Sequence, residues 1–238
     1  MKIDLYENYT STSVFHNIKE QKLTSWSKKY YKAFIEPHLG KNKNIRILEI
    51  GCGYGRYTQS IIQSGYNNIR GIDISEEQIS YAIRYMGLEN KVELADAIEY
   101  MTSKNEYDVI LLMDVMEHLE LSYTTELLQS IHRSLSKDGK LIIHVPNGLS
   151  PLKAPYHNDI THLRAFSSDS LSQLLRIVGF DKFNHFALPP LVTGFISFIR
   201  RCFWILLFNP LIKFYMLTAN SSTCGGIFTP NILSVATK

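Results

Sequence analysis

The sequence of 238 residues predicts an α/β protein built on a doubly wound, mainly parallel sheet. Five short apolar segments alternate with segments of helical periodicity, which is the pattern of successive strand–helix units. A turn with three glycines follows the first apolar segment, and an aspartate lies near the end of the second. In open α/β sheets both positions lie at the edge where ligands bind.

The first predicted strand is 45–50, an apolar run with several β-branched side chains, which is typical of a strand buried on both faces. Gly51, Gly53 and Gly55 follow it at alternate positions, and a helical pattern begins directly after them. Glycines at a strand-to-helix turn allow a sharp bend and a close approach of a ligand to the backbone. Arg56 stands where the dinucleotide-binding pattern requires its third glycine, so the sequence does not favour a dinucleotide.

Acidic side chains mark the ends of the second and third predicted strands. The second strand, 69–74, contains Asp73, which stands roughly 20 residues after the glycine turn, as in nucleotide-binding sheets. A carboxylate there can accept hydrogen bonds from both hydroxyls of a ribose, although Asp73 could instead cap the helix predicted over 76–86. The third strand, 91–95, is followed at once by Asp96, which can cap the next helix.

Two further strand–helix units complete the predicted parallel sheet. The fourth strand, 107–113, leads into a helical segment that contains His118. An imidazole near neutrality can remove a proton from a hydroxyl group, so His118 is either a general base or a helix-start residue without a chemical role. A helix over 123–135 and a glycine turn at 137–140 precede the fifth strand, 141–145.

Taken together, the glycine turn, the acidic strand ends and the segment after the fourth strand resemble the motifs of class I S-adenosylmethionine-dependent methyltransferases. The resemblance covers residues 45–188 and a closing segment, 231–238. It implies a Rossmann-like doubly wound sheet of seven strands whose last strand is antiparallel, with S-adenosylmethionine as the cofactor. It also implies the residues that bind the cofactor: Glu49, Gly51, Gly53, Gly55, Asp73, Ile74, Asp96, Ala97, Met113, Asp114 and Val115.

The resemblance assigns a part of the cofactor to four of these side chains. It implies that Glu49 and Asp114 bind near the methionine amine. It implies that Asp73 binds the ribose and that Asp96 binds the amino group of the adenine. The implied reaction is the in-line transfer of the methyl group from the sulfonium to an acceptor hydroxyl. Holding the two reacting atoms in line can contribute ~7–11 kcal/mol to catalysis.

The loop at 151–166 places five polar side chains close together in the sequence: His157, Asp159, Thr161, His162 and Arg164. Loops that follow strand ends are where substrate groups are placed. Part of this loop resembles methyltransferases of bacterial surface-polysaccharide biosynthesis, which implies a sugar acceptor with His162 or His157 as the base. Asp159 or Arg164 would then position the sugar. A loop ordered by its own hydrogen bonds is the alternative. Metal binding by His157, Asp159 and His162 is conceivable, but no metal is predicted because further ligands at credible spacing are missing.

One more helix and two more strands are expected after this loop. The polar run 167–170 can cap a helix over 171–178, which ends at Gly179. A sixth strand is predicted over 180–188. The segment 231–236 resembles the last, antiparallel strand of the family, so it would close the sheet.

The N-terminal segment, 1–44, is predicted to form a helical lid. Trp26, Tyr30 and Phe34 recur at four-residue spacing, so one face of their helix is aromatic. The helix either packs on the edge of the sheet or covers the cofactor. In the second case Tyr9 or Tyr30 would lie near the ligand.

An apolar and basic insertion, 189–230, precedes the closing strand. Within its most apolar part, 191–217, Arg200 and Arg201 interrupt the hydrophobic run and Asn209–Pro210 breaks it again. The sequence therefore does not predict a helix that spans a bilayer. It predicts two short helices at a membrane interface, with the basic side chains facing lipid phosphates. The alternatives are a helical hairpin over the acceptor pocket and a contact in a homodimer.

The charge distribution and the cysteine content indicate which partners and which cellular compartment to expect. Residues 182–238 contain basic side chains and no Asp or Glu, which suggests an anionic partner such as a membrane for this part of the chain. No basic stripe runs through the remainder, so nucleic acid is not predicted. Three widely separated cysteines and the lack of a visible secretory signal predict a cytoplasmic protein without disulfides or zinc, located at the inner face of the cell membrane if the insertion binds lipid.

The favoured acceptor is a sugar of a surface or lipid-linked glycan, because the polar loop and the basic apolar insertion both suit it. A hydrophobic small molecule such as a quinone precursor or a lipid is the second choice. A non-catalytic S-adenosylmethionine-binding protein is a third interpretation, which the complete set of cofactor residues disfavours. A nicotinamide dehydrogenase is disfavoured by Arg56 at the position of the third glycine.

Overall fold

One seven-stranded sheet forms the centre of the protein, in a computed structural model that describes residues 25–101 and 106–238. The strands lie in the order β3-β2-β1-β4-β5-β7-β6, and β7 runs antiparallel to both of its neighbours. This confirms the predicted doubly wound sheet with an antiparallel last strand. The strands are β1 (Ile47–Ile50), β2 (Ile69–Asp73), β3 (Val92–Leu94), β4 (Tyr107–Met113), β5 (Leu135–Pro146), β6 (Lys182–Ala187) and β7 (Asn231–Thr237).

Strand β5 is longer than predicted because it begins before the glycine turn. Tyr107 of β4 pairs with Leu135, whereas Val109 pairs with Lys140. The predicted turn therefore lies in an irregular stretch between two paired residues, and Asp138 within it has a positive φ of 61°. The chain keeps its pairing with β4 on both sides of the turn.

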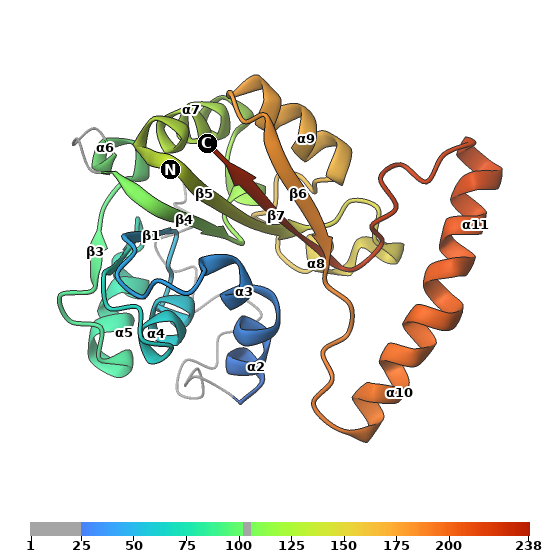
Figure 1. Ribbon diagram of the computed structural model, residues 1–238, viewed down its shortest axis with the longest axis horizontal. Coiled ribbons are helices and arrows are strands. Elements are labelled where there is room, and N and C mark those ends of the chain that lie inside the picture. Colours follow the sequence, from blue (N-terminus) through green and yellow to red (C-terminus); the bar gives the residue numbers. More distant parts are fainter. Residues whose placement is uncertain (1–24, 102–105) are drawn as a thin grey trace.

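Helices cover both faces of the sheet (Figure 1). Ile110 and Leu112 of β4 pack on one face, and Val109 and Leu111 pack on the other. The helices of the first face are α6 (Ala97–Tyr100), α7 (Leu121–Ser134) and α9 (Ser168–Ile177). Those of the opposite face are α2 (Ser25–Phe34), α3 (Glu36–Leu39), α4 (Arg56–Gln63) and, beside α4, α5 (Glu76–Met86). Short helical turns connect the remaining segments: η2 (Met116–His118), η3 (Pro151–Lys153) and α8 (Ala154–His157).

The N-terminal helix α2 packs on the sheet through one side and carries an aromatic row on another. Tyr31 and Ile35 are buried in the core with residues of β1 and β4. Trp26 stacks on Tyr30 at 5.0 Å between ring centroids, and Phe34 meets Tyr30 edge-on at 4.9 Å. The part of the predicted lid that contains Tyr9 lies outside the described residues.

The insertion forms one long helix, whereas the sequence predicted two short ones. Helix α10 (Phe195–Phe203), a π-helical stretch at Trp204–Phe208 and α11 (Asn209–Asn220) are continuous. Pro210 lacks an N–H and normally interrupts a helix, but the wider π turn before it leaves room for its ring. Figure 1 shows this helix, in orange to red, standing apart from the sheet and its helical layers.

The sequence disfavoured a spanning helix because Arg200, Arg201 and Asn209–Pro210 interrupt the apolar run, but the helix itself is continuous across them. The continuous helix Phe195–Asn220 has 26 residues, so by length and composition it is long and apolar enough to cross a bilayer. Very little of its apolar length is buried against the rest of the described protein.

Candidate active site

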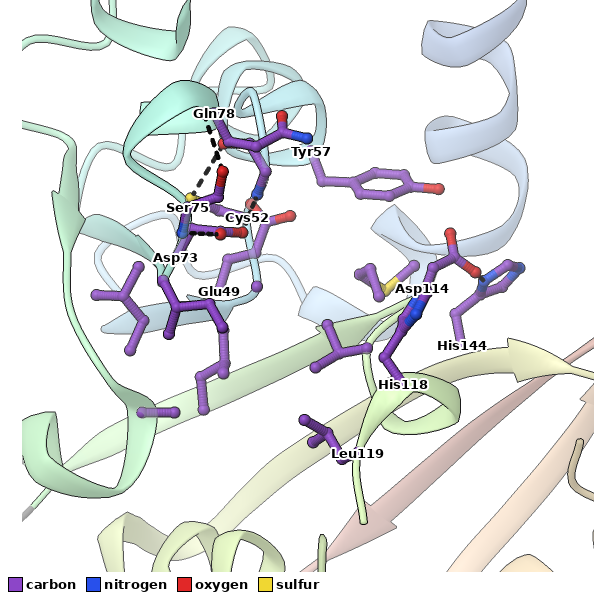
Figure 2. Close-up of a pocket in the computed structure, with 18 of the residues that line it drawn as sticks. Glu49, Cys52, Tyr57, Asp73, Ser75, Gln78, Asp114, His118, Leu119 and His144 are labelled. Carbon is purple, nitrogen blue, oxygen red and sulfur yellow. Dashed lines mark hydrogen bonds and ion pairs between the residues drawn. The ribbon is translucent and has the colours of Figure 1, made fainter. Parts of the chain in front are cut away.

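A cavity of about 1010 Å³ lies at the carboxyl ends of β1, β2 and β4. Except for Gly55, the residues predicted to bind the cofactor line this cavity. Figure 2 shows Asp73 on one side of it and Asp114 on the other. Of the residues predicted to act on the acceptor, His118 lines the cavity. Four other described residues with such a predicted role are not part of its wall: His157, Asp159, His162 and Arg164.

Packing requires glycine at two positions of the turn after β1. Gly51 and Gly55 have φ values of +68° and +80°, which other residues rarely adopt. A Cβ atom on Gly51 would collide with the side chain of Val115, and one on Gly55 would collide with Leu88. Gly51 therefore lets the ends of β1 and β4 approach at the cavity, whereas Gly55 lets the start of α4 pack against the segment after α5.

Asp73 orders the cavity wall through both of its carboxylate oxygens. Its Oδ2 accepts a hydrogen bond of 2.8 Å from the N–H of Gly53, and its Oδ1 accepts one of 2.8 Å from Ser75. Burial raises the pKa of Asp73, and these backbone hydrogen bonds oppose the rise. The N-cap of α5 is Ser75, whose hydroxyl accepts from the N–H of Gln78, so Asp73 does not have the capping role considered above.

Glu49 is a buried carboxylate at the end of β1. Its Oε2 accepts a short hydrogen bond, 2.5 Å, from the hydroxyl of Thr58. Burial raises the pKa of Glu49 to about 7, although the bond to Thr58 and the charge of Arg56 oppose the shift. A cationic ligand group beside Glu49 would stabilise its ionised form at neutral pH.

Gln78 shows that the residues of this cavity fit a ligand with hydrogen-bond donors. Its side chain lines the cavity, and its Oε1 is buried with no hydrogen-bond partner among the described residues. A buried polar atom without a partner costs about 1–3 kcal/mol. A hydroxyl or ammonium group of a bound cofactor would satisfy it, so the site suits the ribose and amine of S-adenosylmethionine.

Asp96 both caps a helix and lines the cavity. Its Oδ1 accepts from the N–H groups of Ile98 and Glu99 at 2.8 and 3.1 Å, so it is the N-cap of α6. Its Oδ2 accepts from the hydroxyl of Tyr123 at 2.6 Å. The capping alternative is therefore observed, and the contact with adenine stays a prediction.

Three side chains from distant parts of the chain form a hydrogen-bonded row at the opposite wall. Nδ1 of His144 lies 2.6 Å from Oδ1 of Asp114, and Nε2 of His144 lies 2.9 Å from the hydroxyl of Tyr30. Because a carboxylate can only accept, Nδ1–H of His144 donates to Asp114, which leaves Nε2 for the hydrogen bond with the hydroxyl of Tyr30. Burial raises the pKa of Tyr30 far above its ordinary value, so the phenol keeps its proton.

This row fixes a carboxylate that has a strained backbone. Asp114 has a φ of 59°, and its Oδ2 lies 4.0 Å from the guanidinium of Arg56. Burial opposes the charge of Asp114 and by itself would raise its pKa. The interactions with His144 and then with Arg56 are stronger, so the pKa of Asp114 is lowered. His144 and Arg56 were not predicted as site residues. The single histidine inside the apolar strand 141–145 was the one signal in the sequence that could have indicated His144.

His118 joins the cavity to the histidine-containing loop. Its Nδ1 lies 2.8 Å from Oγ1 of Thr161, and its ring centroid lies 4.6 Å from that of His162. Burial is the largest cause that lowers the pKa of His118 to about 4, and the interaction with His162 is the second. Its neighbour Glu117 is fully buried, and burial followed by the charge of Asp114 raises the pKa of Glu117.

The remaining loop residues are held by local contacts. Asp159 accepts hydrogen bonds from the N–H and the hydroxyl of Thr161 at 2.9 and 2.6 Å, as the alternative of a self-ordered loop predicted. His157 is exposed, and its ring packs on Tyr156 at 5.0 Å. Arg164 is half-buried, and its Nη1 has no hydrogen-bond partner among the described residues. These contacts do not bring the three side chains to the cavity wall.

Comparison with known proteins identifies the family. Residues 23–184 match the model of the methyltransferase domain. The ubiquinone biosynthesis O-methyltransferase of Rickettsia bellii is 28% identical over 116 residues, a match that covers 48% of this chain and 47% of that protein. The N-terminal Xaa-Pro-Lys N-methyltransferase 1-B of Xenopus laevis is 26% identical over 121 residues, 49% and 54% of the two chains. The chain thus spans about half the length of the curated relatives it matches.

Solved structures of methyltransferases agree with this chain in fold. A SAM-dependent methyltransferase from Archaeoglobus fulgidus has a TM-score of 0.65 at 21% identity, over 99% of this chain and 100% of that one. Phosphoethanolamine N-methyltransferase 2 of Haemonchus contortus, in complex with S-adenosyl-L-methionine, has a TM-score of 0.67 at 16% identity, over 99% and 60%. The protein therefore belongs to the methyltransferase domain family, and S-adenosylmethionine-dependent methyltransferases share its fold.

Proposed function

We propose that the enzyme O-methylates a lipid-attached acceptor at the inner face of the cell membrane, and that the methylated group is a sugar hydroxyl of a lipid-linked glycan. The observation that carries this proposal is the exposed helix Phe195–Asn220. At 1.5 Å per residue it is about 39 Å long, against about 30 Å for the hydrocarbon core of a bilayer. An acceptor attached to a lipid would be bound from the membrane that this helix contacts.

The surface of the helix supports contact with lipid. Large apolar side chains along its length are more than half exposed, and soluble proteins rarely expose a continuous apolar surface of this size. They include Phe195, Ile196, Phe198, Leu206, Leu211, Phe214 and Tyr215. Arg200, Arg201 and Lys213 are the charged residues of the helix, and basic side chains suit the phosphates of anionic lipids.

Vesicle binding tests the membrane contact. We expect the wild-type protein to co-sediment with anionic vesicles, and Leu206→Glu combined with Phe214→Glu to weaken this at least about 100-fold, since charges in the hydrocarbon region are costly. Ile177→Glu, at an exposed apolar position at the end of α9, should leave vesicle binding unchanged. A wild-type protein that stays in solution and instead dimerises through the helix would contradict the proposal.

The cavity suits methyl transfer to a hydroxyl. Bound S-adenosylmethionine would supply an electrophilic methyl group. Asp73, Glu49 and Gln78 would hold the cofactor on one side, and Asp114 would fix its methionine end. His118 lies at the cavity wall nearest the histidine-containing loop, so the acceptor hydroxyl would lie beside it.

The resemblance of the run 159–166 to surface-polysaccharide methyltransferases favours a sugar as the acceptor. The similarity to the ubiquinone biosynthesis O-methyltransferase of Rickettsia bellii favours a second candidate, a hydroxyl of a polyprenyl quinone precursor. Both acceptors carry a lipid chain, so both suit the exposed helix.

Incubation with methyl-labelled S-adenosylmethionine and a lipid extract of bacterial membranes separates these acceptors. A label that enters the lipid phase and becomes water-soluble after mild acid hydrolysis would identify a lipid-linked sugar. A label that stays in the organic phase would identify the quinone precursor or another lipid and contradict the glycan proposal. Methylation of free sugar nucleotides alone would contradict the lipid-attached acceptor.

A further inference from the structure

We propose that Glu117, His118 and His162 bind a divalent transition-metal ion at the acceptor side of the cavity. The chemical role of this ion rests on the proposed function, because the ion would act on the acceptor hydroxyl. Binding of the ion itself can be measured without any acceptor. The sequence did not predict this site, because two ligands come from η2 and the third comes from the loop after β5.

The three side chains converge in space. A carboxylate oxygen of Glu117 and one ring nitrogen each of His118 and His162 all lie within 4.8 Å of one another. Nε2 of His162 is 4.0 Å from Oε1 of Glu117. A displacement of about 1 Å would bring these atoms to the spacing of ligands that surround an ion at about 2.0–2.2 Å.

Glu117 is the group that most needs a ligand here. The residue is fully buried, and neither of its carboxylate oxygens has a hydrogen-bond partner among the described residues. A buried carboxylate without hydrogen bonds is costly unless it is neutralised or coordinates a metal.

His162 presents the nitrogen that a metal requires. Its Nδ1 lies 2.9 Å from the backbone carbonyl oxygen of Tyr156. A carbonyl oxygen can only accept, so Nδ1 carries the hydrogen and the lone pair is on Nε2, the atom nearest Glu117. Metal-binding histidines almost always donate their other N–H to a carbonyl or carboxylate in this way.

His118 has the same arrangement through a hydroxyl group. The hydroxyl of Thr161 donates to Asp159 at 2.6 Å, so its oxygen accepts the hydrogen bond of 2.8 Å from Nδ1–H of His118. The lone pair of His118 is therefore on Nε2. The hydrogen-bonded row Asp159–Thr161–His118 sets the tautomer and the ring orientation of His118. The hydrogen bonds within the loop would thus orient a metal ligand.

The donor set indicates the kind of metal. Two imidazole nitrogens and one carboxylate oxygen suit Zn²⁺ and related transition ions, whereas Mg²⁺ prefers oxygen ligands. His118 lines the cavity, so the open coordination positions would face the acceptor. The ion would bind the acceptor hydroxyl and lower its pKa. The hydroxyl then releases its proton to water and its oxygen bonds to the methyl carbon, while the sulfonium sulfur keeps the electrons of the broken carbon–sulfur bond.

Calorimetric titration of the metal-stripped protein with Zn²⁺ alone tests the site. We expect one equivalent to bind, with Mg²⁺ far weaker. Glu117→Gln and His162→Ala should each weaken Zn²⁺ binding at least about 100-fold, since changes in outer-shell partners alone cost about 10–100-fold. His157→Ala, which removes an exposed histidine of the same loop, should leave the affinity unchanged.

Thr161→Val provides a variant that keeps all three ligands. It should weaken Zn²⁺ binding about 10–100-fold, because it removes only the hydrogen bond that orients His118. Unchanged affinity for S-adenosylhomocysteine would show that each variant is folded. The inference is overturned if the wild-type chain does not bind Zn²⁺, or if binding persists unchanged in Glu117→Gln and His162→Ala. Zn²⁺ binding without methylation of any lipid-attached acceptor would instead overturn the proposed function alone.

Discussion

The two ends of the cavity differ in how the chain builds them. At the cofactor end, the side chains follow β1, β2 and β4, which are adjacent in the sheet, and each belongs to a short motif. At the histidine end, η2 meets a loop that follows β5, through the hydrogen bond between His118 and Thr161. The first end can be recognised in a sequence because parallel strands bring their ends together automatically. The histidine end cannot be recognised in this way, because it depends on how the loop after β5 packs against η2.

Gly51→Ala should disrupt the cofactor end most. The left-handed backbone costs an alanine roughly 1–2 kcal/mol, and the collision with Val115 adds about 1–3 kcal/mol, so urea unfolding should show a loss of about 2–5 kcal/mol. Gly87→Ala is the matched control: its φ is +66° and no described atom lies within 4 Å of the added carbon. Gly87→Ala should therefore lower the free energy of unfolding only by the roughly 1–2 kcal/mol of the left-handed backbone. Equal losses in the two variants would contradict a role of packing at Gly51.

The pH dependence of stability should report the buried Glu49. Its pKa is about 7 in the folded protein against an ordinary value near 4.5, so between these values the unfolded chain has already released the proton that the folded protein keeps. Raising the pH across this window should therefore cost wild type up to about 3 kcal/mol. Urea unfolding at pH 5 and pH 8 should show a smaller decrease for Glu49→Gln. Parallel pH profiles of the two proteins would contradict the assignment.

Asp73→Ala should weaken binding of S-adenosylhomocysteine by about 2 kcal/mol or more, roughly 30-fold, because hydrogen bonds to a charged acceptor are lost. The N–H groups of Gly53 and Ser75 also lose their partner, so stability should fall as well. Calorimetry measures the affinity, and Asp181→Ala at an exposed position serves as the control. Zn²⁺ affinity should not change, which separates the two ends of the cavity. Unchanged cofactor affinity would remove the ribose assignment.

Tyr30→Phe should have the smallest effect, because it removes one hydrogen bond to His144 and leaves the ring in place. A neutral hydrogen bond contributes about 0.5–1.5 kcal/mol, so affinity for S-adenosylhomocysteine should fall about twofold to tenfold. Tyr85→Phe, at an exposed tyrosine of α5, should not change it. If Tyr30→Phe binds like wild type, the row from Tyr30 to Asp114 does not orient the cofactor end.

The long helix shows where a sequence pattern was misleading. Arg200, Arg201 and Pro210 are ordinary signals that divide an apolar run, and they predicted two short helices. The structure keeps one helix because a π turn precedes the proline and the arginines extend from an exposed surface. A local sequence pattern indicates that a proline or a charged side chain destabilises an apolar helix. It does not indicate whether the structure around that residue relieves the destabilisation.

By itself the sequence determined the strand–helix alternation, the glycine turn and the acidic strand ends, because hydrophobic periodicity and backbone constraints act between close neighbours. These were sufficient for the fold class, and the cofactor was implied by the resemblance of these motifs to class I methyltransferases. Tertiary structure alone decided that His144 reaches Asp114 and Tyr30, and that Glu117 and His118 meet His162. Such contacts depend on side-chain directions in packed elements far apart in the chain, and no local pattern of residue types specifies those directions.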